Sequence, residues 1–293
     1  MKKIISLALV ALMLVMCLAG CGKKNSDFVA TDATDLLKED FGIAVQKGND
    51  TLLAAVNKVV DAWVADGTMT KYVDYYTDLA DYEAGVDGVE KPDAGELATT
   101  WDFGSATEVI TVYTESGFAP FEFISNNEVI GVDIAIMSQV AKDMGKKLDI
   151  KDVAFDTIPT CVEQATGDAV GAAGMTITDE RKDTVDFSNI YYSSTLVVVS
   201  DKDKAISSVK DLDGLKVAVQ EGTSGDLIIS AAADGGYKYE NEDEAEVTVT
   251  VGSETEVVRY KQYALALEDL KSGRVDAILM DKLPALTMLA VAD

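Results

Sequence analysis

The sequence predicts an α/β protein with two lobes, each a mixed sheet flanked by helices. Its 293 residues are enough to form two units with separate hydrophobic cores. Strand-like and helix-like segments alternate along the chain, which is typical of α/β architecture. The same alternation starts again after TLVVVSD, the strand expected at residues 195–201. We therefore expect the two lobes to join at residues 197–201.

The first lobe is expected mainly over residues 106–197. Its helix at residues 130–148 has apolar residues at helical spacing and reaches Gly145 followed by lysines, a typical stop signal. The other segments expected in this lobe are strands at residues 109–114, 148–155 and 168–175 and a helix at residues 158–166.

The second lobe is expected over residues 198–293 and repeats this order of elements. KVAVQEGTSGDLIISAAA, at residues 216–233, predicts a strand, a glycine turn and a helix. Further segments are expected as strands at residues 246–253 and 275–281 and as a helix at residues 263–273. Residues 81–105 are acidic and weakly periodic and contain four glycines and one proline, so we expect a linker there.

The first 20 residues have the layout of an export signal. Two lysines precede an apolar run at residues 4–19, which is too short and too abruptly ended to favour a membrane-spanning helix. LAGC, at residues 18–21, resembles the bacterial lipobox, in which the cysteine becomes the lipid-modified first residue. We expect the mature chain to start at Cys21, with residues 21–26 as a tether outside the cytoplasm. The alternative is an ordinary secretory signal with an incidental cysteine.

Composition excludes several classes of function. With 25 basic and 51 acidic residues, the net charge of -26 makes nucleic acid and anionic lipid poor partners. The absence of histidine removes histidine-based triads and most zinc sites, and the acidic residues do not follow calcium-loop spacing. We expect no metal and no cofactor. Cys17 leaves with the signal and Cys21 is expected to carry lipid, so Cys161 has no disulfide partner.

Five segments carry a family resemblance that covers roughly residues 108–290. They are GFAPFEF, IGVDIAIMSQVAKDMGKKLDIKDVAFD, GMTITDERKDTVDFSNIYYSSTLVVV, DLDGLKVAVQEGTSGDL and LKSGRVDAILMDKLPA. They resemble the extracytoplasmic solute-binding proteins of polar amino-acid ABC importers (solute-binding protein family 3). The resemblance implies a periplasmic-binding-protein-like fold of type II with a two-stranded hinge. It also implies a monomer that closes on a free amino acid and delivers it to a membrane permease.

The chemistry of an amino-acid head group agrees with this resemblance. A receptor for a carboxylate and an ammonium needs a guanidinium, N–H or hydroxyl donors and at least one carboxylate. Arg181 can hold a carboxylate through two parallel hydrogen bonds, which lysine cannot reproduce, and the matching arginine does so in the family. Thr176 is placed to assist. Gly174 matches a position whose backbone carbonyl often binds the ammonium, and Met175 belongs to the same motif.

The second lobe is expected to complete the head-group site. Thr223 and Ser224 open a helix, where free N–H groups favour an anion. Asp281 matches the carboxylate that pairs with the ammonium in the family. Each residue also has a plainer interpretation. Thr223 and Ser224 could be helix N-caps, Asp281 could cap the end of a strand, and Arg181 could lie on the surface.

Specificity is less well defined by the sequence. Phe118 and Phe155 match the positions whose rings sandwich the ligand side chain in relatives, although either could be ordinary core. Glu115 matches a position where relatives place an acid near the tip of that side chain, and it favours a polar or cationic end. Gln220 and Met280 match two further positions that vary with specificity. We expect a polar amino acid.

Two other functions are compatible with the same family. Lipoproteins of this kind can present their ligand to a membrane receptor instead of a permease, and ligand binding would then look identical. The same fold also serves in cyclohexadienyl-type dehydratases, which need a positioned acid and base. The complete head-group set and the absence of histidine favour a binding protein that is not an enzyme.

The stretch before the linker is out of the family's usual order. In the family, the chain adds one more strand to the second lobe, crosses back, and finishes in the first lobe with a segment similar to FGIAVQKGND and helices. Here residues 27–38 resemble that last strand and the crossing, and residues 39–80 resemble the closing strand and helices. We therefore expect a circular permutant whose ordinary termini are joined by residues 81–105.

This hypothesis predicts specific strand neighbours. Residues 41–45 should lie in the sheet that contains residues 109–113, and residues 28–31 should lie in the sheet that contains residues 275–279. The alternative is an unrelated helical stalk in front of a truncated domain, which would form no ladder with either lobe.

Overall fold

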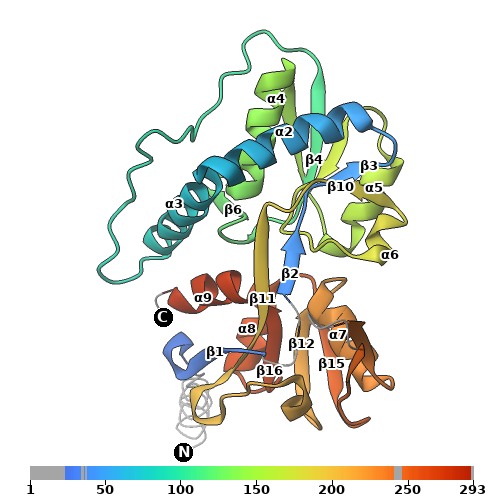
Figure 1. The fold of residues 1–293 in the computed structure, drawn as a ribbon. Coiled ribbons are helices and arrows are strands. Elements are labelled where there is room, and N and C mark those ends of the chain that lie inside the picture. Colours follow the sequence, from blue (N-terminus) through green and yellow to red (C-terminus); the bar gives the residue numbers. More distant parts are fainter. Residues whose placement is uncertain (1–23, 34–35, 37, 241–245, 292–293) are drawn as a thin grey trace, which may run out of the picture.

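Figure 1 shows two lobes, one above the other, connected by two strands. The computed structural model describes residues 24–33, 36, 38–240 and 246–291. The export signal expected at residues 1–20 and the lipid-carrying Cys21 lie outside these residues. None of the helices described in those ranges has the length and apolar character needed to cross a membrane.

The upper lobe of Figure 1, the first lobe, is built on a five-stranded sheet. At its core, β4 (Val109–Thr114) runs parallel to β8 (Lys147–Asp152) and β9 (Ala169–Gly171). β3 (Ala44–Gln46) lies between β9 and β10 (Val185–Phe187) and is antiparallel to both. A segment far upstream of β4 therefore lies inside the sheet of the first lobe.

Helices cover both faces of this sheet (Figure 1). They are α2 (Asp50–Asp66), α3 (Thr68–Glu83) and α4 (Val132–Met144) on one face and α5 (Ile158–Gln164) on the other. The side chain of Asn49 caps α2 by accepting a hydrogen bond from the backbone N of Leu52. Gly67, with a φ of 78°, ends α2 and starts α3, because it can adopt the left-handed conformation this sharp turn needs.

Shorter elements border the cleft between the lobes. A small antiparallel sheet contains β5 (Gly117–Phe118), β6 (Glu122–Ser125) and β7 (Glu128–Ile130). A 3₁₀ turn, η2 (Phe155–Thr157), precedes α5, and the four-residue helix α6 (Asp179–Lys182) precedes β10.

The lower lobe of Figure 1, the second lobe, has a sheet whose first edge strand comes from the start of the described chain. The strand order is β1 (Phe28–Asp32), β11 (Tyr192–Asp201), β16 (Ala277–Asp281), β12 (Lys216–Gln220) and β15 (Glu256–Tyr260). β1 pairs antiparallel with β11, so residues 28–32 complete this sheet. The neighbourhood expected for residues 28–31 is thus present, and that expected for residues 41–45 is present only from Ala44 onward.

The core of the second lobe lies on both faces of its sheet. Val197 and Val199 of β11 pack on the face that is covered by α8 (Tyr263–Lys271) and α9 (Lys282–Ala290). Leu196 and Val198 pack on the opposite face with Ile228 of α7 (Ser224–Ala233). This alternation is the period of two that a strand buried on both faces requires.

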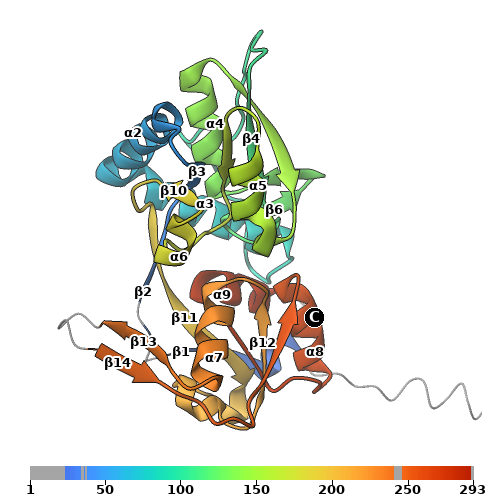
Figure 2. The ribbon, with the colours of Figure 1, turned by 90° about the vertical axis from the view of Figure 1, so that its right-hand side faces the viewer.

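The two lobes are connected by a short antiparallel ladder. β2 (Lys38–Phe41) pairs with residues 192–195 of β11, between the lobes. In Figure 2 the same two strands again bridge the lobes. The crossing therefore lies a few residues before the join expected at residues 197–201, because Val197 already pairs with Met280 inside the second lobe's sheet.

The strand expected at residues 41–45 is divided. Phe41 ends β2 and forms a bridge with Thr176, and β3 begins only at Ala44. Between them, the backbone N of Gly42 donates to the carbonyl of Met175, and the backbone N of Ile43 donates to Ser188 Oγ. These bonds turn the chain from the hinge into the first lobe's sheet, so one continuous strand was the wrong expectation.

Three other expectations need correction. The strand expected at residues 148–155 ends at Asp152, and the one expected at residues 168–175 ends at Gly171, because the chain then leaves the sheet to form the cleft wall. The segment expected as a strand at residues 246–253 forms β14 (Glu246–Val249), which pairs only with β13 (Tyr237–Glu240) in a hairpin. The sheet position beside β12 belongs to β15, which the sequence reading missed.

The linker expected at residues 81–105 begins after Glu83, where α3 ends, and contains no helix or strand. It still packs on the first lobe, because Leu97, Trp101 and Phe103 contact its core. The hydroxyl of Tyr72 donates to the carbonyl of Ala98 at 2.9 Å. The linker therefore covers the outside of α3 rather than standing clear of it.

Because α2 packs in the core of the first lobe, its buried side chains should contribute to the free energy of unfolding. Leu52 is fully buried among first-lobe residues, so Leu52→Ala should lower the free energy of unfolding by about 2–5 kcal/mol. Val64, on the same helix, is 50% exposed, and Val64→Ala should change it by less than about 0.5 kcal/mol. Urea unfolding of both variants measures this, and equal midpoints would show that α2 is not part of the lobe's cooperative core.

Candidate functional site

The candidate site is a small space between the two lobes. Its wall contains residues from the first lobe and from the second lobe, which contributes the end of β12, the start of α7 and the end of β16. The lining residues are Glu115, Phe118, Glu122, Phe155, Ala173, Gly174, Thr176, Gln220, Thr223, Ser224 and Asp281. Buried acids are prominent among them.

Arg181 lies at the edge of this space and is only 8% exposed. Thr178 caps α6 by accepting a hydrogen bond from the backbone N of Arg181, which directs the side chain toward the cleft. The guanidinium donates from Nη1 to the carbonyl of Thr176 at 2.7 Å and from Nη2 to the carbonyl of Gly222, in the other lobe, at 2.9 Å. Its carbon lies 5.3 Å from the ring centre of Phe155. Burial lowers the pKa of Arg181, but arginine stays charged in proteins.

Glu39 of β2 reaches the same place from the hinge, and sequence analysis did not identify it. Its Oε2 accepts hydrogen bonds from Ser224 Oγ at 2.6 Å and from Thr176 Oγ1 at 3.0 Å. The two donors come from different lobes. Burial raises the pKa of Glu39, while the two hydroxyl groups and the charge of Arg181 oppose that rise.

Asp281 ends β16 and is 5% exposed. Its side chain does not cap α9, although the residue stands at the N-cap position, and its Oδ1 has no hydrogen-bond partner in the part of the chain that the structure describes. Burial, reinforced by the negative charge of Glu39, raises the pKa of Asp281 well above its ordinary value. A buried carboxylate with an unused acceptor can bind an ammonium group.

The far end of the space is held by amide side chains from the second lobe. Gln220 Nε2 and Gln262 Nε2 donate to the two oxygens of Glu115, each at 2.8 Å. Burial raises the pKa of Glu115. Phe118 stacks on Tyr263 at 6.3 Å, so an aromatic wall also crosses from one lobe to the other.

Gly174 combines two requirements that exclude a side chain. Its φ is 54°, and a Cβ there would lie 2.6 Å from Cε1 of Phe118. Its backbone N donates to Oδ2 of Asp133, a fully buried residue of α4, at 2.9 Å. Asp133 therefore fixes the backbone turn that presents Gly174 to the cleft.

Most residues predicted from the sequence line this space, Arg181 lies beside it in contact with Thr176 and Phe155, and two others lie elsewhere. Met175 points into a separate cluster with Phe155 and Val185. Met280 lines a different surface groove, because neighbouring residues on a strand face opposite sides and Asp281 faces the site. Sequence analysis missed Glu39, Glu122, Gln262 and Tyr263. Only Glu122 lay within a motif already recognised, GFAPFEF.

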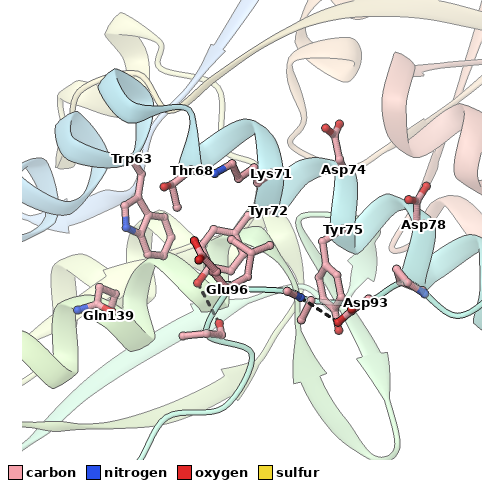
Figure 3. A pocket seen from close by; sticks show the side chains of 15 residues that line it. Trp63, Thr68, Lys71, Tyr72, Asp74, Tyr75, Asp78, Asp93, Glu96 and Gln139 are labelled. Atoms are coloured by element: carbon pink, nitrogen blue, oxygen red, sulfur yellow. Dashed lines mark hydrogen bonds between the residues drawn. The ribbon is translucent and has the colours of Figure 1, made fainter.

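A second hollow lies between α3 and the linker. Figure 3 shows Tyr72 and Tyr75 facing residues 92–98, with Trp63 at one side. Its charged side chains are exposed to solvent, namely Lys71, Asp74, Asp78, Asp93 and Glu96. An exposed charge is screened by water, so this hollow lacks the buried guanidinium and carboxylate of the interlobe site.

Metal chemistry has no visible support in the described part of the chain. Within residues 24–33, 36, 38–240 and 246–291, no group of three or more His, Cys, Asp or Glu side chains is placed to hold a metal ion. Cys161 is half-buried on α5 and carries a free thiol. The groups that the site offers a ligand are hydrogen-bond donors and acceptors and buried ionisable side chains.

Comparison with known proteins gives consistent matches. The description "Bacterial extracellular solute-binding proteins, family 3" fits residues 110–242. The ABC transporter arginine-binding protein 1 of Escherichia coli (strain K12) is 32% identical over 187 residues, covering 63% of this chain and 68% of that protein. The chain belongs to the family 3 bacterial extracellular solute-binding proteins.

Two further relatives show the extent of the likeness. The arginine-binding extracellular protein ArtP of Bacillus subtilis (strain 168) is 29% identical over 181 residues, and the match covers 62% of this chain and 64% of ArtP. The solved structure of an ancestral arginine-binding protein bound to arginine has 34% identity and a TM-score of 0.52, covering 61% of this chain and 72% of that one. These relatives are named as binding proteins, not enzymes. The family 3 fold with two lobes agrees with Figures 1 and 2.

Asp133 predicts a pH dependence of stability in this family 3 protein. Burial raises its pKa from 3.8 to about 7. The contribution of Asp133 to the free energy of unfolding is therefore complete below its pKa in the unfolded chain. It is lost as the pH rises toward about 7, its pKa in the folded protein. Asp133→Asn keeps an acceptor for Gly174 and should remove about 2–4 kcal/mol of this loss between pH 4 and 8. Urea unfolding at both pH values measures it, and identical pH slopes for the two proteins would contradict the assignment.

Proposed function

We propose that this family 3 solute-binding protein binds a free, polar amino acid outside the cytoplasm and delivers it to an ABC transporter. The observation that carries the proposal is a pair of buried groups at the interlobe space: the guanidinium of Arg181, at its edge, and the carboxyl group of Asp281, which lines it. An amino-acid head group is the small molecule whose carboxylate and ammonium match this pair.

The ligand carboxylate is received by Arg181 with help from Thr176 and Ser224. The guanidinium already bridges the lobes through its contacts with the carbonyls of Thr176 and Gly222. Ser224 is the first residue of α7, so its backbone N–H is among those not used inside the helix. The ammonium is received by Asp281 and by the carbonyl of Gly174. Because donors come from both lobes, the site is complete only when the cleft closes about the β2–β11 hinge.

The side-chain end of the site favours a polar or cationic ligand. Glu115 and Glu122 are buried there, and neither oxygen of Glu122 has a hydrogen-bond partner among the described residues. Phe118, Phe155 and Tyr263 supply aromatic faces that suit a hydrocarbon stem or a guanidinium. The arginine-binding names of the relatives support this choice of ligand class.

The order of elements supports a circular permutation. β1, β2 and β3 precede the region matched by the family, yet they fill positions in sheets that also contain strands from that region. Residues 84–108 connect α3 to β4 without a helix or strand and cover the distance over the surface of the first lobe. We place the junction of the ordinary termini in this connection. The lipid anchor at Cys21 belongs to the same proposal and rests on the LAGC motif.

Replacing Arg181 tests the proposed function directly. Arg181→Ala leaves the ligand carboxylate buried and unpaired, which should cost about 2–5 kcal/mol, or roughly 30- to several-thousand-fold in Kd. Arg181→Lys should recover only part of this, because an ammonium cannot form the two parallel bonds. Calorimetry against a panel of free amino acids measures both variants.

Arg259 offers a matched control. It is an exposed arginine of the second lobe whose guanidinium binds Asp226 and Ser230 outside the cleft. Arg259→Ala should leave amino-acid affinity within about threefold of the wild type. Full-strength binding by Arg181→Ala would reject the head-group site, and a wild-type protein that binds no amino acid would reject the function.

A further inference from the structure

Glu39 is an internal carboxylate that engages two residues expected to bind the ligand carboxylate. It is 6% exposed and belongs to the hinge strand β2, which Figures 1 and 2 show passing between the lobes. A single oxygen, Oε2, accepts hydrogen bonds from Ser224 of the second lobe and Thr176 of the first. These hydroxyl groups belong to two of the residues that the proposed function gives to the ligand carboxylate.

Each of these hydroxyl groups has only one hydrogen to donate, so it cannot bond to Glu39 and to a ligand carboxylate at the same time. A serine or threonine hydroxyl carries one hydrogen and can donate one hydrogen bond at a time. While Glu39 accepts from both hydroxyl groups, neither can donate to a second carboxylate. The lone pairs of the hydroxyl oxygens and the charge of Glu39 would instead face the incoming carboxylate, and both repel it.

Protonation of Glu39 would reverse this effect. A neutral carboxyl group no longer repels the ligand, and its own O–H can donate to the ligand carboxylate in a short, strong bond. We propose that Glu39 gates the amino-acid site: as an anion it holds Thr176 and Ser224 and opposes the ligand, and by taking up one proton it admits the ligand carboxylate. This inference rests on the proposed function.

The surroundings of Glu39 bear on its titration. The ionisable groups that act on it are Arg181 of α6, Asp281 of β16, Tyr237 of β13 and Tyr263 of α8. Arg181 is the one cation among them and favours the charged form of Glu39, whereas Asp281 and burial favour the neutral form. A ligand carboxylate beside Arg181 would offset that cation, which raises the pKa of Glu39 further and draws in the proton.

The test compares Glu39→Gln with the wild type, using L-arginine, L-histidine and L-glutamine as probes. Glutamine keeps the size of the side chain and cannot carry the opposing charge. At about pH 8, Glu39→Gln should bind the best probe about tenfold or more tightly than the wild type, because hydrogen bonds to a charged group no longer have to be given up. Asp40→Asn is the matched control, since Asp40 is the next residue of β2 and its Oδ1 accepts a hydrogen bond from Ser193 rather than from Thr176 or Ser224.

Proton uptake provides a measurement that a merely structural role would not change. Calorimetry in two buffers of different ionisation enthalpy should show that wild-type binding takes up a fraction of a proton, and that affinity rises as the pH falls, by at most about tenfold per pH unit. Glu39→Gln should lose this component and Asp40→Asn should keep it. The wild-type measurement does not depend on how well any variant folds.

A ligand without a carboxylate completes the test. Agmatine, which is arginine without its carboxylate, should gain nothing from Glu39→Gln. The inference is overturned if Glu39→Gln binds no more tightly than Asp40→Asn, if agmatine gains as much as L-arginine, or if proton uptake is unchanged. Binding by Glu39→Gln but not by the wild type supports the gate. Failure of both proteins to bind any probe overturns the proposed function and the gate together.

Discussion

The antiparallel pairing of β2 with β11 is the interaction on which both lobes depend. β11 continues from this ladder into the sheet of the second lobe, where it pairs with β1 and β16. β2 leads through Phe41, which bridges to Thr176, into the sheet of the first lobe. The same short strand carries Glu39 into the cleft. Hinge, lobe closure and access to the site are therefore connected by one four-residue strand.

The cleft concentrates negative charge that the rest of the protein does not neutralise. Glu39, Glu115, Glu122, Asp133 and Asp281 are all buried around it, and the buried cation among the described residues there is Arg181. Each uncompensated carboxylate in such a place is costly, so burial raises their pKa values. A zwitterionic or cationic ligand supplies the missing positive charge. The arrangement lowers stability by itself and becomes favourable through binding, which is typical of functional sites.

The sequence was most informative about site residues that lie close together within one sequence motif. Arg181 follows Thr176 within one motif, and Asp281 ends a strongly apolar strand, so both could be placed by their neighbours in sequence. Glu39 could not, because its partner Ser224 is 185 residues away and their contact exists only after β2 has paired with β11. A short sequence motif cannot predict a contact such as this one, because the position of the side chain depends on the pairing of the hinge strands.

The same reasoning explains the errors in the fold. Residues 246–249 alternate between polar and apolar more regularly than residues 256–260, yet the first segment forms a two-stranded hairpin and the second joins the sheet. Alternation reports that one face is buried, but it does not say against which partner. By contrast, the early segment FGIAVQKGND could be placed, since the sheet of the first lobe is short of a strand without it.

The central claim is that one interlobe site receives an amino-acid head group between Arg181 and Asp281. A crystal structure of the protein grown with L-arginine tests this claim most directly. The account predicts the ligand carboxylate within hydrogen-bond distance of the Arg181 guanidinium and of Ser224, the ammonium on Asp281, and Glu39 no longer the acceptor of both hydroxyl groups. A ligand bound between α3 and the linker, or one whose carboxylate lies away from Arg181, would contradict it.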